Sequence, residues 1–196
     1  MRTKINVAAL EQLFTKARTH HAWTAAAVED ELLGQLYELV KWGPTSANSL
    51  PMRVLFLKSK DAKEKLIPAI APGNVDQVRA APVTAIVAYD QKFYDRLPEL
   101  MTAFDARSMF ASNPELAEKS AFRNSSLQGG YFILAARALG LDAGPMSGFD
   151  NAKVDELFFK NSSWRSNFLC NLGHGDDSKL YPRGPRLMFN DVCKIL

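Results

Sequence analysis

The chain has little cysteine, little net charge and no long apolar run, and each shortage excludes a class of protein. Only two cysteines, Cys170 and Cys193, occur among 196 residues, which is too few for a disulfide framework or a four-cysteine zinc site. The formal net charge is +3, from 24 Lys and Arg against 21 Asp and Glu. No extended basic run could follow a phosphate backbone, so we expect no nucleic-acid partner.

The apolar stretches are short as well. The run from Tyr131 to Ala136 is far shorter than the roughly 20 residues that cross a bilayer, and residues 1–10 lack the apolar core of a signal peptide. We therefore expect a cytoplasmic protein with no membrane partner and with reduced thiols. Hydrophobic residues make up 47% and charged residues 23%, as in globular proteins. No linker or repeat divides the chain, so residues 1–196 are expected to form a single domain.

Several catalytic and nucleotide-binding signatures are missing. There is no G-x-S-x-G elbow, no Walker loop and no G-x-G-x-x-G. His20 and His21 are adjacent, so their side chains should point apart, and His174 is the only other histidine. We therefore predict no metal site. An enzyme of this sequence that uses NAD(P)H needs another way to hold its redox group.

Hydrophobic periodicity predicts many helices and few strands. The expected helices are 7–17, 31–42, 61–67 and 114–139, and the expected strands are 53–58, 83–88 and 165–172. Asp30 is a candidate cap, and Asp61 and Glu64 have the spacing of a capping box. This order predicts an α+β fold with a central mixed β-sheet flanked by helices.

Two segments are harder to assign. Residues 125–138 are nearly all small or apolar, so we expect the middle of the long helix to be buried on all sides, in the core or at a subunit interface. Residues 90–113 mix aromatic and charged side chains. They fit a surface subdomain, which we favour, or a mobile cover over a site.

Two polar segments in the first quarter of the chain could bind a ligand. Residues 43–51 (Gly-Pro-Thr-Ser-Ala-Asn-Ser-Leu-Pro) offer hydroxyl and amide groups that could hold a planar polar ring, although a turn explains them more simply. Arg18 and Thr19 could clamp a phosphate, since a guanidinium is a bidentate donor. Equally, residues 18–23 could be a solvated helix end with Trp23 in the core.

Two further segments follow the long helix. Glycines in residues 140–150 flank Pro145, Met146 and Ser147 and would let the backbone approach a flat ligand, although a helix end and a turn would use them too. Residues 173–186 place basic side chains after a strand and a Gly turn. These could bind an anion or form an exposed basic tail.

Taken together, the four segments resemble the FMN-dependent nitroreductase family. The resemblance is closer to its malonic semialdehyde reductase branch, which is associated with pyrimidine catabolism. It extends from Phe14 to Val192 and is most specific in residues 41–48 (KWGPTSAN), 121–126 (AFRNSS) and 139–150 (LGLDAGPMSGFD). It implies an intertwined homodimer in which both chains hold each FMN, with the long helix at the centre of the dimer.

The resemblance also implies which residues contact the flavin. Those at the phosphate end are Arg18, Thr19, Arg183 and Arg186, with His20 and His21 along the ribityl chain and ring. Those along the ring edge are Pro44, Thr45, Ser46 and Asn48, with Asn74 beside the ring. Those over the ring near N5 are Pro145, Met146, Ser147 and Gly148.

Three positions depart from the family pattern. Leu50 stands where many relatives have Gln, His21 or Ala22 replaces a second cation, and Ser147 replaces the Glu of some nitroreductases. All three concern contacts that the resemblance would otherwise assign to the pyrimidine end of the ring.

The activity that the resemblance implies is reduction of malonic semialdehyde to 3-hydroxypropionate, with NADH or NADPH as the reductant. A broad nitro or quinone reductase and a non-catalytic flavin-binding protein are the alternatives. Ser147 and Arg53, or a flavin hydroxyl, are candidates to polarise the aldehyde carbonyl. Arg107 and Arg123 are candidates to bind the substrate carboxylate.

Overall fold

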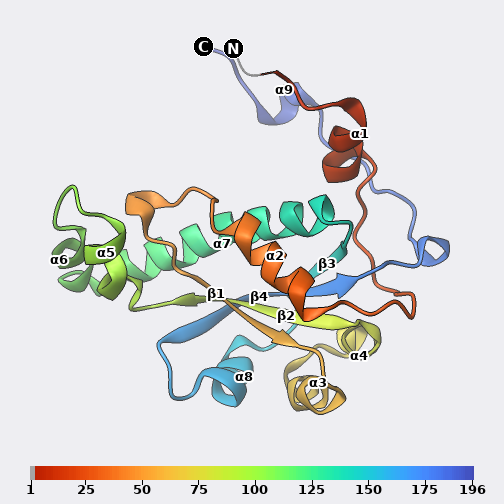
Figure 1. Ribbon diagram of the computed structural model, residues 1–196, viewed down its shortest axis with the longest axis horizontal. Helices are drawn as coiled ribbons and strands as arrows, with labels where there is room; N and C mark the ends of the chain where they lie inside the picture. The colour runs from red at the N-terminus through yellow and green to blue at the C-terminus, as the bar shows by residue number, and fades with distance from the viewer. Residues whose placement is uncertain (1–2) are drawn as a thin grey trace.

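A four-stranded sheet with helices on both faces forms the centre of the computed structural model, which describes residues 3–196 (Figure 1). The strands are β1 (Met52–Leu57), β2 (Val83–Asp90), β3 (Asp142–Met146) and β4 (Trp164–Gly173), in the spatial order β1-β2-β4-β3. The α+β class is confirmed. The expected mixed sheet is corrected, because all three strand pairs are antiparallel. Within residues 3–196, parallel pairing is limited to an isolated bridge between Thr19 and Ala143, which lies outside the named strands.

Helices cover both faces of this sheet. Their bounds are α1 (Val7–Leu10), α2 (Asp30–Val40), α3 (Lys60–Leu66), α4 (Val75–Ala80), α5 (Leu97–Leu100), α6 (Ala106–Ala111), α7 (Pro114–Ala138), α8 (Asn151–Val154) and α9 (Phe189–Val192). In Figure 1, α2 and α7 lie on one face, and α3, α4 and α8 lie on the other. Single π-helical turns extend α1 (Glu11–Thr15) and α8 (Asp155–Phe159).

Strand β2, which contains the expected strand 83–88, separates two hydrophobic cores. All eight of its residues are buried. Alternate side chains point to opposite faces of a strand, so Val83, Ala85 and Val87 pack with α2 and α7. Ile86 and Ala88 pack on the opposite side with α3, α4 and α8.

Helix caps follow the sequence only in part. As expected, α7 begins at Pro114, and the Asn113 side chain accepts a hydrogen bond from the Leu116 amide at 3.0 Å. The caps expected at Asp30 and Asp61 are corrected. Asp30 is already the first residue of α2. Ser59, rather than Asp61, caps α3 by accepting from the Ala62 amide at 3.1 Å.

Within one chain, helix α7 is buried on one face only, so the core of that chain does not enclose its middle. Burial of the other face at a subunit interface stays a prediction. The buried face includes Ser125, Gln128 and Phe132. Large apolar side chains stay exposed on the rest of the helix, and we call Leu116, Leu127 and Tyr131 the α7 stripe. At about 100° per residue these three lie on one side of the helix, whereas the exposed Phe122 lies on another side, against Tyr89. A single chain therefore leaves an apolar face uncovered.

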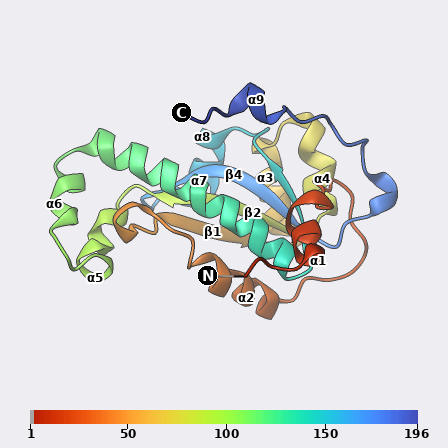
Figure 2. The same ribbon diagram turned by 90° about the horizontal axis from the view of Figure 1, so that it is seen from above.

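Residues 90–113 form a small subdomain, as favoured from the sequence. Phe93, Leu97 and Phe110 are buried there with Ala117 and Ala121 of α7. This third cluster lies at the end of the molecule where α7 begins (Figure 2). Within the part of the chain that the structure describes, no helix combines the length and apolar character needed to cross a membrane.

Candidate functional site

Four arginines gather around one cavity of about 720 Å³, which we call the arginine cavity. Arg18, Arg137, Arg183 and Arg186 line it with Phe14, Thr15, Ala17, Thr19, His21, Gln77, Tyr181, Pro182 and Gly184. The sequence predicts Arg18, Thr19, His21, Arg183 and Arg186 as neighbours, and the fold brings them together. No Asp or Glu is among the lining residues, so the cavity carries unbalanced positive charge.

Backbone carbonyls, rather than carboxylates, hold these guanidiniums. Arg183 donates to the Ala17 carbonyl at 3.1 Å, Arg137 donates to that of Leu13 at 3.0 Å, and Arg18 donates to that of Tyr181. Arg186 donates to the carbonyls of Gly184 and Pro185. Within residues 3–196, by contrast, Arg53, Arg79, Arg96, Arg107 and Arg165 all have carboxylate partners. The cavity thus keeps its arginines unneutralised, as a site for an anion requires.

His20 does not line this cavity, unlike its neighbour. Its ring is buried between two carboxylates, with Nδ1 3.3 Å from Asp142 and Nε2 3.1 Å from Asp177. A Cβ on Gly175 would lie 2.0 Å from this ring, so the glycine allows the enclosure. The His20 ring therefore does not face the arginine cavity, and a flavin contact at His20 stays a prediction. His20 ties residues 18–21 to β3 and to the C-terminal segment instead.

His21 points the other way and lies flat on an aromatic side chain. Its ring stacks on Tyr181 with centroids 4.1 Å apart and planes inclined by 12°. Residues 18–21 can approach β3 closely because Gly144 has no side chain: a Cβ there would lie 2.4 Å from the His20 carbonyl oxygen. The alternation of His20 and His21 thus turns one imidazole inward and one toward the cavity.

Residues 145–147 form a second concave surface with α7. Pro145, Met146 and Ser147 line a groove of about 390 Å³ together with Phe168 and with Ser126, Gly129, Gly130 and Ile133 of α7. Gly129 is required there, since a Cβ would lie 2.5 Å from the Phe168 ring. The exposed Ser147 hydroxyl forms no hydrogen bond within residues 3–196, so it is free to meet a ligand.

Asn74 supports this segment from the side. Its Nδ2 donates to the Gly148 carbonyl at 3.2 Å, and the Ala71 amide donates to the same carbonyl at 3.0 Å. Asn74 thus lies beside residues 145–148, with its amide directed at the backbone of Gly148. Its place beside a flavin ring stays a prediction. Gln77, one helical turn further along, reaches the arginine cavity.

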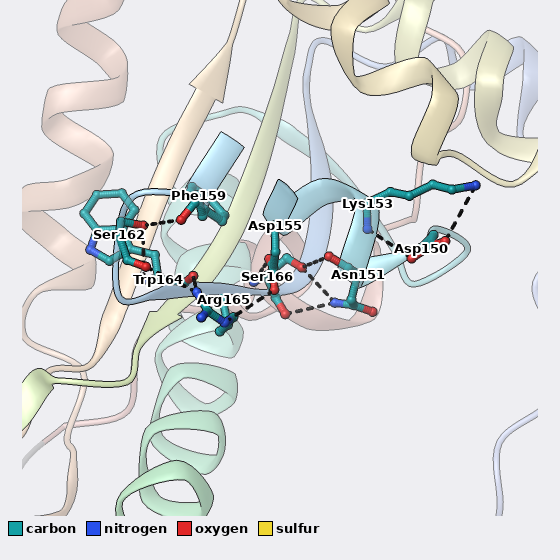
Figure 3. A network of polar contacts seen from close by, with 9 residues as sticks. All are labelled: Asp150, Asn151, Lys153, Asp155, Phe159, Ser162, Trp164, Arg165 and Ser166. Atoms are coloured by element: carbon teal, nitrogen blue, oxygen red, sulfur yellow. Dashed lines mark hydrogen bonds and ion pairs between the residues drawn. The ribbon is translucent and has the colours of Figure 1, made fainter. Parts of the chain in front are cut away.

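A polar network fixes the chain that follows Gly148 (Figure 3). Asp150 accepts from the Lys153 amide at 3.1 Å and caps α8. Asn151 donates to the Ser166 carbonyl at 2.9 Å, and the Ser166 amide donates to Asp155 at 2.7 Å. These contacts anchor α8 and the turn after it to β4. The segment that precedes Asp150 is therefore held from both ends.

The loop 44–48 lies elsewhere in the chain and lines neither the arginine cavity nor the groove. The Ser46 amide donates to Asn124 of α7 at 2.8 Å, and the Asn48 side chain donates to the Leu100 carbonyl at 2.9 Å. The Thr45 hydroxyl accepts from the Leu50 amide at 3.1 Å. Within a single chain, the loop 44–48 therefore lies apart from the residues of the arginine cavity and of the groove that are also predicted to contact the flavin.

Backbone strain is concentrated in this loop and two residues after it, at Leu50. Ala47, Asn48 and Leu50 have positive φ angles of 52°, 48° and 40°. Non-glycine residues rarely adopt this left-handed region, and such residues gather at functional sites. The hydrogen bonds from this loop to Asn124 and to the Leu100 carbonyl hold the backbone in the strained conformation.

The remaining candidates separate into paired and unpaired arginines. Arg53 is half-buried and donates to Asp90 at 2.8 Å and to the carbonyls of Leu50 and Met52. Arg107 is 3.1 Å from Asp95. Arg123 lies exposed on α7 and makes no ion pair within the described residues. No group of three or more His, Cys, Asp or Glu in the described chain could hold a metal ion.

Sequence reasoning missed Arg137 and Gln77. The signal for Arg137 was present, because it is the lone charge in the apolar run 129–139. Burial lowers the pKa of its guanidinium, and its Nε is a buried donor with no partner. An unpaired buried donor in a carboxylate-free cavity fits an anionic group such as the phosphate of FMN.

The chain belongs to the Nitroreductase family, which it matches over residues 15–174. A Rhodopseudomonas palustris (strain TIE-1) protein named "Putative NADH dehydrogenase/NAD(P)H nitroreductase" is 58% identical over 187 residues, covering 95% of each chain. A solved structure from Exiguobacterium sibiricum 255-15, in complex with FMN, has a TM-score of 0.85 at 25% identity and covers 100% of both chains. The ydfN structure from Bacillus subtilis has a TM-score of 0.86 at 21% identity, covering 97% of this chain and 100% of that chain.

Proposed function

We propose that this protein is an FMN-dependent NAD(P)H oxidoreductase. The observation that carries the proposal is the arginine cavity, where four unneutralised guanidiniums surround a space lined by no carboxylate. The family membership and the FMN-containing structure similar to this chain support the same ligand. The chemistry that FMN supplies when bound is hydride transfer from NAD(P)H to a second substrate.

The residues of the chain have distinct tasks in this proposal. Arg18, Arg183 and Arg186, with the Thr19 hydroxyl, bind the phosphate through charge-assisted hydrogen bonds. Pro145, Met146 and Ser147, held in place by Asn74 and the α8 network, offer a small-residue surface against which a flat ring can lie. The Ser147 hydroxyl is free to donate a hydrogen bond to a substrate carbonyl. Arg53 is committed to Asp90, so Ser147 is the better candidate for that task.

We propose further that the working unit is a homodimer, with the loop 44–48 of one chain beside the ligand of the other. Three observations support this. The strained loop lines neither the arginine cavity nor the groove of its own chain, and the α7 stripe is uncovered. The C-terminal residues 187–196 also expose apolar side chains, with Leu187 at 74% and Phe189 at 58%. A second copy would cover these surfaces and bring Thr45, Ser46 and Asn48 to the ring.

Malonic semialdehyde is the substrate that we propose, on the resemblance of the sequence to that branch of the family. Its carboxylate needs a cation outside the phosphate site. Arg123 suits this role better than Arg107, because Arg107 already contacts Asp95. A broad nitro or quinone reductase would need no such cation.

Anaerobic reduction and reoxidation test these proposals. The purified protein should carry FMN that NADH or NADPH bleaches, and malonic semialdehyde should restore the oxidised spectrum. Flavin that NAD(P)H never bleaches would refute the reductase. Reoxidation only by nitro compounds or quinones would refute the semialdehyde as substrate. Arg123→Ala should raise KM for the semialdehyde and leave quinone reduction unchanged, whereas equal loss on both substrates would remove Arg123 from the site.

A further inference from the structure

Arg137 differs from the other three arginines of the cavity in its origin and surroundings. It comes from the last turn of α7, whereas Arg18 precedes β1 by more than thirty residues and the other two belong to the C-terminal segment. Arg183 and Arg186 are exposed, but Arg137 is partly buried. Burial lowers the pKa of its guanidinium, while the charge of Asp142 acts in the opposite direction.

The hydrogen bonds of Arg137 leave donors unused. The Nη1 group donates a hydrogen bond to the Leu13 carbonyl at 3.0 Å. The Nε group is buried and has no hydrogen-bond partner within the described residues. A basic residue at a helix C-terminus is also favoured by the helix dipole, which explains a positive charge at this position. The dipole does not explain an unpaired, buried Nε, because an exposed lysine would serve the dipole as well.

Arg137 also contacts the N-terminal segment that closes one side of the cavity. The Gln12 side chain donates to the Arg137 carbonyl at 2.6 Å, while Arg137 donates to Leu13. Phe14 and Thr15, which follow directly in the π-helical turn Glu11–Thr15, line the cavity. The same arginine thus faces the cavity and holds the segment that walls it.

From these contacts we propose that Arg137 is an anion-binding residue for a phosphate monoester and that it couples binding of the phosphate to docking of residues 7–15. The proposal rests on the proposed function for the identity of the ligand. When an anion occupies the cavity, the unused donors of Arg137 gain an acceptor. The guanidinium is then fixed, and its bond to Leu13 holds the N-terminal segment against the cavity. Without the anion, the bond to Leu13 is the one hydrogen bond that the Arg137 side chain makes within residues 3–196.

The test compares FMN with riboflavin, which lacks the phosphate. Flavin-free wild-type protein, Arg137→Gln and Arg137→Lys are titrated with both ligands by flavin fluorescence, after circular dichroism has verified the fold. Arg137→Gln should lower the ratio of FMN to riboflavin affinity by about tenfold or more, as expected for loss of a charge-assisted hydrogen bond. Arg137→Lys should retain part of the ratio. Lys119→Gln, which removes the same charge from the exposed surface of α7, should retain all of it.

Hydrogen exchange supplies a readout independent of activity. FMN or inorganic phosphate should slow amide exchange in residues 7–15 of the wild type and of Lys119→Gln, but not of Arg137→Gln. An unchanged FMN to riboflavin ratio in Arg137→Gln, or equal loss of both affinities, would overturn the proposal in favour of a purely structural role. If Arg137→Gln does not fold, Arg137→Lys takes its place: a partial loss of the FMN to riboflavin ratio would support the proposal, and a ratio equal to that of the wild type would overturn it.

The outcome separates this inference from the proposed function. If the wild-type protein binds no flavin, the proposed function fails, and inorganic phosphate then tests Arg137 alone. Phosphate should raise the melting temperature of the wild type more than that of Arg137→Gln. An equal rise in both proteins would overturn the role of Arg137.

Discussion

Asn74 and Gly148 approach so closely that the glycine cannot be replaced without moving the asparagine. The Asn74 amide donates to the Gly148 carbonyl at 3.2 Å, and a Cβ on Gly148 would lie 2.4 Å from Asn74 Nδ2. The contact sets the position of the segment over which we place the flavin ring. A glycine is therefore favoured at position 148 for a steric reason and not for its backbone conformation.

We therefore expect Gly148→Ala to destabilise the protein by about 1–3 kcal/mol, as overpacking does, and to weaken FMN binding. Denaturant unfolding and fluorescence titration measure the two effects. Gly34→Ala is the control, because no atom lies within 4 Å of a Cβ built on this exposed residue of α2. Alanine there should stabilise the protein by about 0.5–1 kcal/mol. An unchanged FMN affinity in Gly148→Ala would contradict the placement of the ring.

Asp90 should be a structural residue rather than part of the chemistry. It accepts from Arg53 at 2.8 Å, from the Ser163 hydroxyl at 2.6 Å and from the Lys92 amide at 2.9 Å. Asp90→Asn leaves Arg53 without its carboxylate in a half-buried setting and should cost about 1–3 kcal/mol of unfolding free energy. Urea unfolding tests this.

The matched control is Asp95→Asn, which removes an exposed pair with Arg107. Surface pairs contribute little, so its unfolding free energy should change by less than about 1 kcal/mol. Equal effects at both positions would show that burial does not distinguish the two ion pairs. A strict loss of turnover in Asp90→Asn without loss of stability would return Arg53 to the list of catalytic candidates.

The α7 stripe should hold two copies of the chain together. Leu127→Glu places a charge in the middle of this stripe, where desolvation in a dimer interface would be costly. We expect light scattering to give the mass of a dimer for the wild type and of a monomer for the variant. Lys60→Glu, at the start of α3 on the other face of the sheet, should remain dimeric. A wild-type protein that is monomeric at micromolar concentration with FMN bound would contradict the shared site.

The two cysteines should differ in reactivity. Complete burial raises the pKa of the Cys170 thiol to about 12, whereas Cys193 is exposed. Because the thiolate is the reactive form, a thiol reagent at pH 8 should modify one cysteine of the folded protein and two after unfolding. Rapid modification of both in the native protein would be inconsistent with this packing.

The same shift has a consequence for alkaline stability. The pKa of the Cys170 thiol is 9.0 when the thiol is exposed and about 12 when it is buried in the folded protein. A raised pKa in the folded state contributes stability that is present below the lower value and is lost as pH rises between the two. Cys170→Ser should therefore show a smaller decline in unfolding free energy between pH 9 and 11 than the wild type. An identical decline would assign alkaline unfolding to other groups.

Local chemistry by itself determined several elements. The uncharged run 83–88, with its β-branched residues, predicts a buried strand, and these residues form most of β2. The order of Asn113, Pro114 and a long helical run fixes the start of α7. The family motifs could likewise be recognised from the sequence, because they depend on the order and spacing of short segments. The structure brings Arg18, Thr19, Arg183 and Arg186 together at one cavity.

Tertiary packing decided what those signals left open. Glycine and proline in Asp142–Met146 conceal a strand that forms only because β4 supplies its hydrogen-bond partners. The sequence could not show that His20 turns inward to Asp142 and Asp177, since those carboxylates come from distant segments. Nor could it show that Arg137, alone in an apolar run, reaches the same cavity as the C-terminal arginines. Periodicity assigns a side chain to a face of its own element, but the partner of that face depends on how remote elements pack.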